Sequence, residues 1–165
     1  MDRLEAIRQS TLFTGIEPAQ CEVFLAIVHE QEAKPGEYLF RLGDPARMLY
    51  IIRSGTVHLT MPIAMNGTVK EVVVQEARAG ETVAWSALVA PFRFTMSGRA
   101  GTDVELIAFS TRELQAAIEA YPDAGVRVVT NLAAVIARRL QVMHAMWTRE
   151  LQRTINVTFG EGAGA

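Results

Sequence analysis

Few residues in this sequence are of the types that carry out chemistry, and they lie far apart. The chain has three histidines, His29, His58 and His144, and no two of them have the spacing of metal ligands. No nucleophile is paired with a general base, which covalent catalysis would require. We therefore expect no catalytic residue, no enzymatic activity and no metal site.

One stretch, residues 80–100, combines hydroxyl groups, an arginine and aromatic rings. It reads GETVAWSALVAPFRFTMSGRA and is predicted to form a turn, a short apolar segment and a return strand. Thr95 and Ser97 offer hydroxyl groups to a ligand, and Arg93 offers a guanidinium. We interpret this stretch as the part of the chain around which the other elements are arranged.

The composition limits the classes of protein to consider. With 165 residues, half of them hydrophobic, the chain is expected to form one globular domain. A formal net charge of -2 gives no general attraction to nucleic acid or to an anionic membrane. The charged start MDRLEAIRQS and the lack of a run of about 20 apolar residues predict a cytoplasmic chain without a membrane segment.

The first 30 residues are predicted to be helical. Pro18 suits a first helical turn, and Cys21, Phe24 and Val28 recur on one face at helical spacing. Cys21 is therefore interpreted as a core residue. As the single cysteine, it allows no internal disulfide, which is typical of a reducing compartment.

From residue 31 the pattern changes to short segments rich in β-branched and aromatic residues. Turn signals separate them about every dozen residues, which is typical of an antiparallel sandwich or barrel. These signals are Pro35-Gly36, Gly43-Asp44-Pro45, Ser54-Gly55, Asn66-Gly67 and Ala79-Gly80. We predict an α+β chain, mainly β, with a jelly-roll-like double-stranded β-helix over about residues 31–109.

Helices are predicted to follow this β-roll. Ser110 and Glu113 form a capping-box pattern at the start of a capping helix over about residues 111–121. A long helix is expected over about 123–155, because no proline interrupts it. A single domain would then span residues 1–155, with a flexible tail over 156–165.

The long helix would extend about 45 to 50 Å, more than a domain of this size can cover. Its apolar side chains recur at steps of three and four, so we expect a parallel homodimer that buries this seam. The alternative is that the stripe packs on its own β-domain. The predicted interface residues are Leu132, Ile136, Leu140, Met143, Trp147 and Leu151.

Over roughly residues 10–155 the chain resembles the cyclic-nucleotide-binding domains of catabolite-activator-type regulators. The resemblance lies in LFTGI, in PGEYLFRLGDPARMLYIIRSGTV, in ARRLQV, and in Ala87, Leu88 and Arg99-Ala100 of the stretch 80–100. It implies that this stretch, which we call the cassette, is the family's phosphate-binding cassette.

The family's cassette implies a glutamate, after a glycine, for the ribose hydroxyl and an arginine for the cyclic phosphate. In this chain the glycine falls on Ala84, the glutamate on Trp85 and the arginine on Phe94. Losing two such hydrogen bonds costs on the order of a hundred- to ten-thousand-fold in affinity, so ordinary cyclic AMP binding is not expected. An alternative is a one-residue slip that brings Arg93 to the phosphate.

The resemblance also implies that two hydroxyl residues of the long helix line the pocket, and here these are Met143 and His144. Met143 fits the dimer seam equally well. His144 is interpreted as a surface residue, and the alternatives are a neutral donor to a ligand or a haem or metal ligand, since some relatives sense gases through haem. We do not expect haem in this chain. The residues predicted to line the ligand site are Ala84, Trp85, Ser86, Ala87, Arg93, Phe94, Thr95, Met96, Ser97, Met143 and His144.

Two functional hypotheses follow. In the first, a small-molecule effector enters the cassette and shifts the two long helices, which requires differential affinity for two helix arrangements. In the second, aromatic side chains close the pocket, and the chain is a pseudo-receptor that serves as a scaffold for dimerisation or for a protein partner. Because only residues 156–165 follow the long helix, we expect neither a helix-turn-helix domain nor direct DNA binding.

Overall fold

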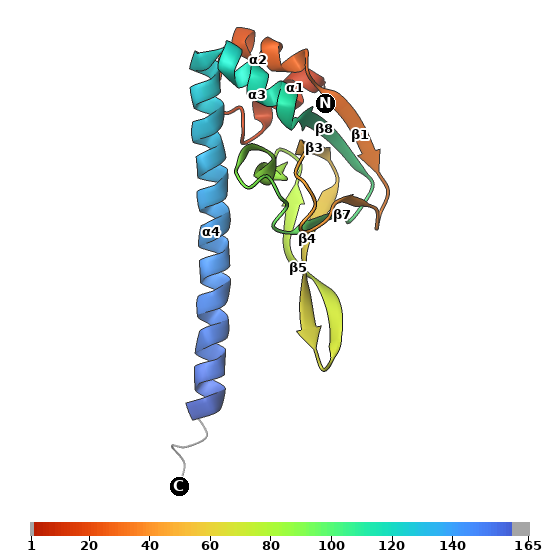
Figure 1. The fold of residues 1–165 in the computed structure, drawn as a ribbon, viewed down its shortest axis with the longest axis vertical. Coiled ribbons are helices and arrows are strands. Elements are labelled where there is room, and N and C mark those ends of the chain that lie inside the picture. Colours follow the sequence, from red (N-terminus) through yellow and green to blue (C-terminus); the bar gives the residue numbers. More distant parts are fainter. Residues whose placement is uncertain (1, 160–165) are drawn as a thin grey trace. The chain divides into compact units, whose positions relative to one another are not determined.

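The computed structural model describes residues 2–159. The chain divides into two compact units, Met1–Leu132 and Ala133–Ala165. The first contains all the strands and the short helices (Figure 1). The described part of the second is the continuation of the long helix α4. Whether residues 1–155 form a single domain stays a prediction.

Two short helices, α1 (Arg3–Gln9) and α2 (Pro18–Leu25), begin the chain. Pro18 occupies the first turn of α2, where its missing N–H costs nothing. Cys21 is fully buried, as expected of a core residue. Burial raises the pKa of its thiol.

The prediction of helix up to residue 30 was wrong at its end. Residues His29–Ala33 form strand β1, which pairs with β8 along its whole length. Four of its five side chains are exposed, so this segment has little apolar periodicity to read. Pairing with a distant strand decides its conformation.

Two four-stranded antiparallel sheets form the β-roll, which confirms the predicted mainly β jelly-roll class. The first sheet has the order β1-β8-β3-β6 and the second β2-β7-β4-β5. In the first sheet the remaining strands are β3 (Met48–Ser54), β6 (Thr82–Val83) and β8 (Val104–Ser110). The second sheet consists of β2 (Tyr38–Phe40), β4 (Thr56–Met65), β5 (Thr68–Arg78) and β7 (Ser97–Ala100).

The centre of the first sheet is buried on both faces. Along β3 and β8 the buried residues are continuous instead of alternating, as expected of strands covered on both sides. One cover is the group of short helices at one end of the sheets (Figure 1), where Phe13 lies 5.7 Å from Phe109 between ring centroids. The core of the roll is therefore continuous with the helical layer.

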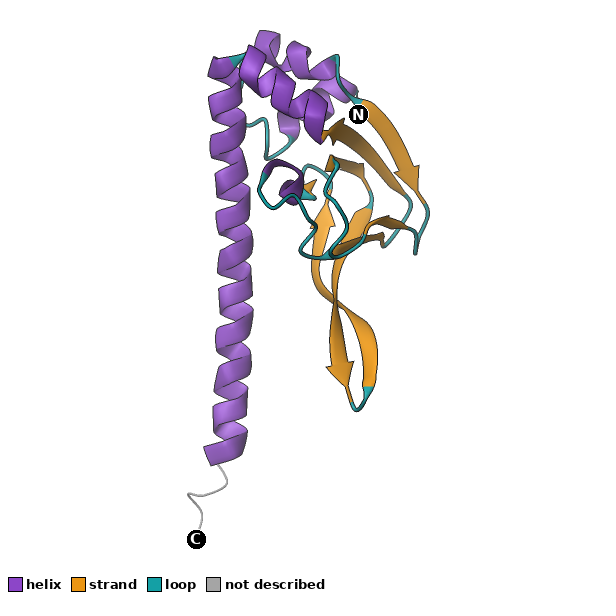
Figure 2. Cartoon of the chain, in the orientation of Figure 1, coloured by secondary structure: helices purple, strands orange, loops and turns teal. Residues whose placement is uncertain are grey.

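Strands β4 and β5 form a long hairpin whose end extends beyond the other strands (Figure 2). Asn66 and Gly67 at its tip both have positive φ, 49° and 78°, which a tight two-residue hairpin turn requires. Side chains from Pro62 to Glu71 are exposed.

Helix α3 (Thr111–Ala120) begins as the capping box predicts, because the Ser110 hydroxyl accepts a hydrogen bond from the Glu113 N–H. Helix α4 (Pro122–Phe159) follows, with Pro122 as its first residue. None of the helices within residues 2–159 has the length and apolarity needed to cross a bilayer.

The predicted end of the long helix was four residues short. Residues 156–159 are helical, and Gly160 is the first glycine after Gly125, so no strong helix breaker precedes it. The prediction of a tail over 156–165 is therefore wrong for residues 156–159. The other six residues lie outside the described part of the chain.

Candidate functional site

Within the cassette, one residue other than glycine has a left-handed backbone directly before the 3₁₀ helix. After β6, Ala84 has φ 63° and ψ 33° and precedes the short 3₁₀ helix η1 (Trp85–Leu88). A backbone of this kind favours glycine, and the family resemblance places a glycine at this position. Ala84 thus adopts a backbone conformation that favours glycine, although it carries a side chain.

Backbone N–H groups in and just after η1 donate hydrogen bonds to carbonyls of the same short segment. The Ala87 N–H donates to the Ala84 carbonyl at 3.0 Å, and the Val89 N–H donates to the Ser86 carbonyl at 3.3 Å. Ala84, Ser86 and Ala87 are all buried, whereas Trp85 is half-buried. Three of the four predicted ligand residues in this segment are therefore packed inside the roll.

Phe94, at the position of the family's arginine, is also buried, with 7% of its surface exposed. Its ring centroid lies 4.6 Å from that of Phe40. Phe40 in turn stacks on Tyr50, with 6.1 Å between centroids and 9° between ring planes. Phe94 is therefore held by an aromatic stack that spans both sheets.

Two further features keep this stack apolar and tight. Gly98 leaves the space that the Phe40 ring occupies, since a Cβ at Gly98 would overlap that ring. Burial raises the pKa of the Tyr50 phenol, so this group stays neutral at physiological pH. The stack thus contains no charged group.

Arg93 points away from Phe94. It is exposed, and its guanidinium donates from Nη1 to the Gly43 carbonyl at 2.8 Å. The backbone around it is fixed as well, because the Phe94 N–H donates to the Asp44 carbonyl and the Gly43 N–H donates to the Phe94 carbonyl. Neighbouring side chains on an extended segment face opposite sides, and here the ring is the one that faces inward.

The remaining predicted residues of the cassette lie at the start of β7 and just before it, in different environments. Ser97 is buried, and its Oγ accepts a hydrogen bond from the Leu42 N–H at 3.0 Å. Met96 is half-buried and Thr95 is exposed. The Ser97 hydroxyl thus already has a structural partner.

Met143 and His144 belong to the second unit, where both are exposed. Their predicted position across the cassette therefore stays a prediction. Along the same helix, Leu140, Trp147 and Leu151 are 50%, 69% and 49% exposed. Ile136 is half-buried, whereas Leu132 is 5% exposed and offers little surface to a partner.

Two histidines to which the sequence analysis gave no role each lie near a carboxylate, and His58 Nε2 lies 3.5 Å from Glu76 Oε1. His29 Nε2 lies 2.8 Å from Glu113 Oε2. Hydrogen bonds from Ser110 and then from His29 lower the pKa of Glu113. The contact between His29 and Glu113 connects the start of β1 to the first turn of α3.

Within residues 2–159, no group of three or more histidine, cysteine, aspartate or glutamate side chains is arranged so that it could hold a metal ion.

Curated relatives match most of this chain but extend well beyond it. The chain is 27% identical over 84% of its length to glutaminase 1 of Bradyrhizobium diazoefficiens and spans 21% of that protein. It is 29% identical over 82% of its length to the cyclic AMP receptor protein of Thermus thermophilus and spans 59% of it.

Solved structures share the fold. The catabolite activator protein of Thermus thermophilus is 28% identical, with a TM-score of 0.68 over 87% of this chain and 63% of that chain. A cyclic nucleotide-binding domain from Methylobacillus flagellatus is 19% identical, with a TM-score of 0.74 over 91% of this chain and 81% of that chain, and shows the fold alone. The family model of the cyclic nucleotide-binding domain matches residues 30–121, so the chain belongs to the cyclic nucleotide-binding domain family.

Proposed function

We propose that this chain is a non-enzymatic, cytoplasmic regulatory module of the family that does not bind cyclic AMP in the usual way. The observation that carries this proposal is the burial of Phe94 against Phe40 at the position of the family's phosphate-binding arginine. A cyclic phosphate placed there would meet an aromatic ring in an apolar stack. Nothing at that position could donate a charge-assisted hydrogen bond.

The residue at the position of the family's ribose-binding glutamate also argues against cyclic AMP binding. Trp85 stands where the resemblance places the glutamate, and an indole N–H donates but does not accept. A ribose hydroxyl would therefore lose its acceptor. Each lost bond of this kind costs about 1.5 to 3 kcal/mol, so both substitutions act against nucleotide affinity.

The alternative in which Arg93 replaces the family's arginine has less support. Its guanidinium is exposed and bonded to the Gly43 carbonyl. Two backbone hydrogen bonds, one to Gly43 and one to Asp44, fix Phe94 as the inward residue. A one-residue slip would break these bonds and expose a ring that is now buried.

Signalling is proposed to pass through a homodimer of the long helices. The 38 residues of α4 span about 57 Å at 1.5 Å per residue. In its second-unit part, the side chains of Leu140, Met143, Trp147 and Leu151 are about half exposed or more and recur at steps of three and four. A second copy offers the same stripe, so a parallel pair would remove both from water.

A second candidate function is a scaffold whose cassette is permanently closed by its own side chains. The continuous stack of Phe94, Phe40 and Tyr50 favours it. The sensor and the scaffold differ in whether a small molecule changes the helix pairing. A ligand screen that measures the pairing of the long helices distinguishes the two functions, because a small molecule would change this pairing only in the sensor.

Titration with cyclic AMP and cyclic GMP, followed by calorimetry and by melting temperature, tests the proposal. We expect no heat of binding and no rise in melting temperature at millimolar nucleotide. The variant Trp85→Glu/Phe94→Arg serves as a comparison, since it restores the two residue types that the family uses. A micromolar response of the unchanged protein would overturn the proposal.

The dimer is tested separately by light scattering. Replacing Leu140 and Trp147 by glutamate places charges on the proposed seam and is expected to give a monomer. Arg149→Glu is the matched control, because residue 149 lies on the opposite face of the helix from 140 and 147. An unchanged dimer in the double variant would place the interface elsewhere.

A further inference from the structure

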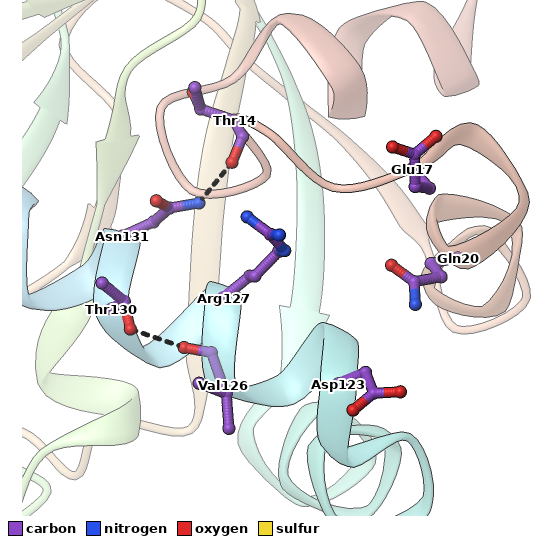
Figure 3. A pocket seen from close by; sticks show the side chains of 8 residues that line it. All are labelled: Thr14, Glu17, Gln20, Asp123, Val126, Arg127, Thr130 and Asn131. Atoms are coloured by element: carbon purple, nitrogen blue, oxygen red, sulfur yellow. Dashed lines mark hydrogen bonds between the residues drawn. The ribbon is translucent and has the colours of Figure 1, made fainter.

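A cavity of about 590 Å³ lies in the first unit, away from the cassette, between the start of α2 and the start of α4 (Figure 3). Glu17, the N-cap residue of α2, and Gln20 of α2 line it on one side, and Asp123, Arg127 and Thr130 line it from α4. Its volume is in the range of small-molecule sites.

Charged groups of both signs surround this cavity without pairing. In Figure 3 the Arg127 guanidinium points toward the loop that carries Thr14, whereas Glu17 and Asp123 lie apart from it, and the Asp123 carboxylate points away from Arg127. Within the described part of the chain, none of these three side chains forms an ion pair or a hydrogen bond. Asp123 and Arg127 are four residues apart on one helix, a spacing that readily allows a salt bridge, yet they do not form one.

The walls of the cavity are held in place by hydrogen bonds. The Asn131 side-chain amide donates from Nδ2 to the carbonyls of Leu12 and Thr14, both at 2.9 Å. It thereby fixes the loop between α1 and α2 to α4. The Thr130 hydroxyl donates to the Val126 carbonyl of its own helix at 2.8 Å, which leaves its oxygen free to accept.

We propose that this cavity binds a small zwitterion, namely a free α-amino acid with a polar side chain. Its carboxylate would accept two parallel hydrogen bonds from Arg127, and its ammonium would donate to Glu17 and Asp123. The Gln20 amide and the Thr130 hydroxyl would meet the polar side chain.

The mixture of charges selects against other ligand classes. A phosphate or another polyanion would meet the two carboxylates, and a polyamine would meet the guanidinium. Only a ligand that carries both signs of charge satisfies all three groups. Because the occupant would contact both α2 and α4, it would strengthen the packing of the long helix on the N-terminal helices, independently of the cassette.

A thermal-shift screen of the full chain with the common free L-amino acids at millimolar concentration, followed by calorimetry, tests this inference. A polar amino acid such as L-glutamine is expected to raise the melting temperature. N-acetyl-L-glutamine and L-glutamine methyl ester each lack one charge and are expected to bind at least about tenfold more weakly. Inorganic phosphate and putrescine, which carry only one sign of charge, are expected to give no shift.

Variants connect the binding to the cavity. Arg127→Gln and Glu17→Gln are each expected to weaken binding by about tenfold or more. Arg112→Gln, an exposed arginine of α3 outside the cavity, is the matched control and should bind unchanged. Circular dichroism of each variant verifies folding, which we expect to persist because Arg127 and Glu17 are exposed.

The inference is overturned if no free amino acid raises the melting temperature, or if the blocked forms bind as tightly as the free one. It is also overturned if Arg127→Gln binds as tightly as the unchanged chain. These results leave the proposal for the cassette unaffected, since cyclic nucleotides are titrated separately.

Discussion

The cassette and the cavity between α2 and α4 differ in whether their side chains have packing, hydrogen-bond or ion-pair partners within the protein. In the cassette, Phe94 packs on Phe40 and the Ser97 hydroxyl accepts a backbone hydrogen bond. In the cavity, Arg127, Glu17 and Asp123 remain unpaired within the described residues. A site whose groups satisfy one another has little to gain from a ligand, whereas separated charges around a cavity gain partners when a ligand binds.

The largest expected effect concerns the ring that fills the cassette. Phe94→Ala should lower the free energy of unfolding by about 3 to 5 kcal/mol, because it removes a buried ring and leaves a cavity. Urea unfolding measures the change. The neighbouring Phe92 is 41% exposed, and Phe92→Ala, the matched control, should cost less than about 1 kcal/mol. Equal losses in both variants would show that Phe94 is not a core residue.

A smaller effect is expected where the cassette makes room for its stack. Gly98→Ala places a methyl group in the space of the Phe40 ring and should cost about 1 to 3 kcal/mol through overpacking. Thermal unfolding provides the measurement, with Thr95→Ala as the control because Thr95 is exposed on the same segment. A neutral Gly98→Ala would mean that the stack is loose enough to admit a ligand, which would weaken the contrast with the cavity.

The smallest effect is expected at the wall of the cavity. Asn131→Ala removes two hydrogen bonds to the α1–α2 loop and should cost about 1 to 2 kcal/mol. Hydrogen exchange of the Leu12 to Thr14 amides should increase as the loop loosens. Thr130→Ala is the control, since its hydroxyl bonds only to its own helix. If exchange is unchanged in Asn131→Ala, the cavity is not held open by this residue.

Much of the fold could be predicted from local chemistry. Turn glycines between short β-rich segments predict the roll, and Gly36, Gly43 and Gly55 all have the positive φ that such turns use. The Ser110 hydroxyl also caps α3 as expected, by accepting a hydrogen bond from the Glu113 N–H. These features depend on neighbouring residues, which sequence patterns record directly.

The features that escaped prediction depend on distant partners. His29–Ala33 is a strand because it pairs with β8, more than 70 residues away in the register from His29 to Ala108. Glu17 and Arg127 line the same cavity, although the sequence around each residue gives no indication that the two segments lie close together. The resemblance assigns Phe94 to the arginine position, but its packing on Phe40 follows only from the arrangement of the two sheets.

The most direct test of the central claim is an NMR measurement of the cassette with and without millimolar cyclic AMP. The account predicts a nuclear Overhauser effect between the Phe94 and Phe40 rings that persists with nucleotide present. It also predicts unchanged amide shifts over residues 84–88. Saturable shifts of these amides, together with loss of the contact between the Phe94 and Phe40 rings, would show that cyclic AMP binds in the cassette and displaces Phe94. This result would contradict the account.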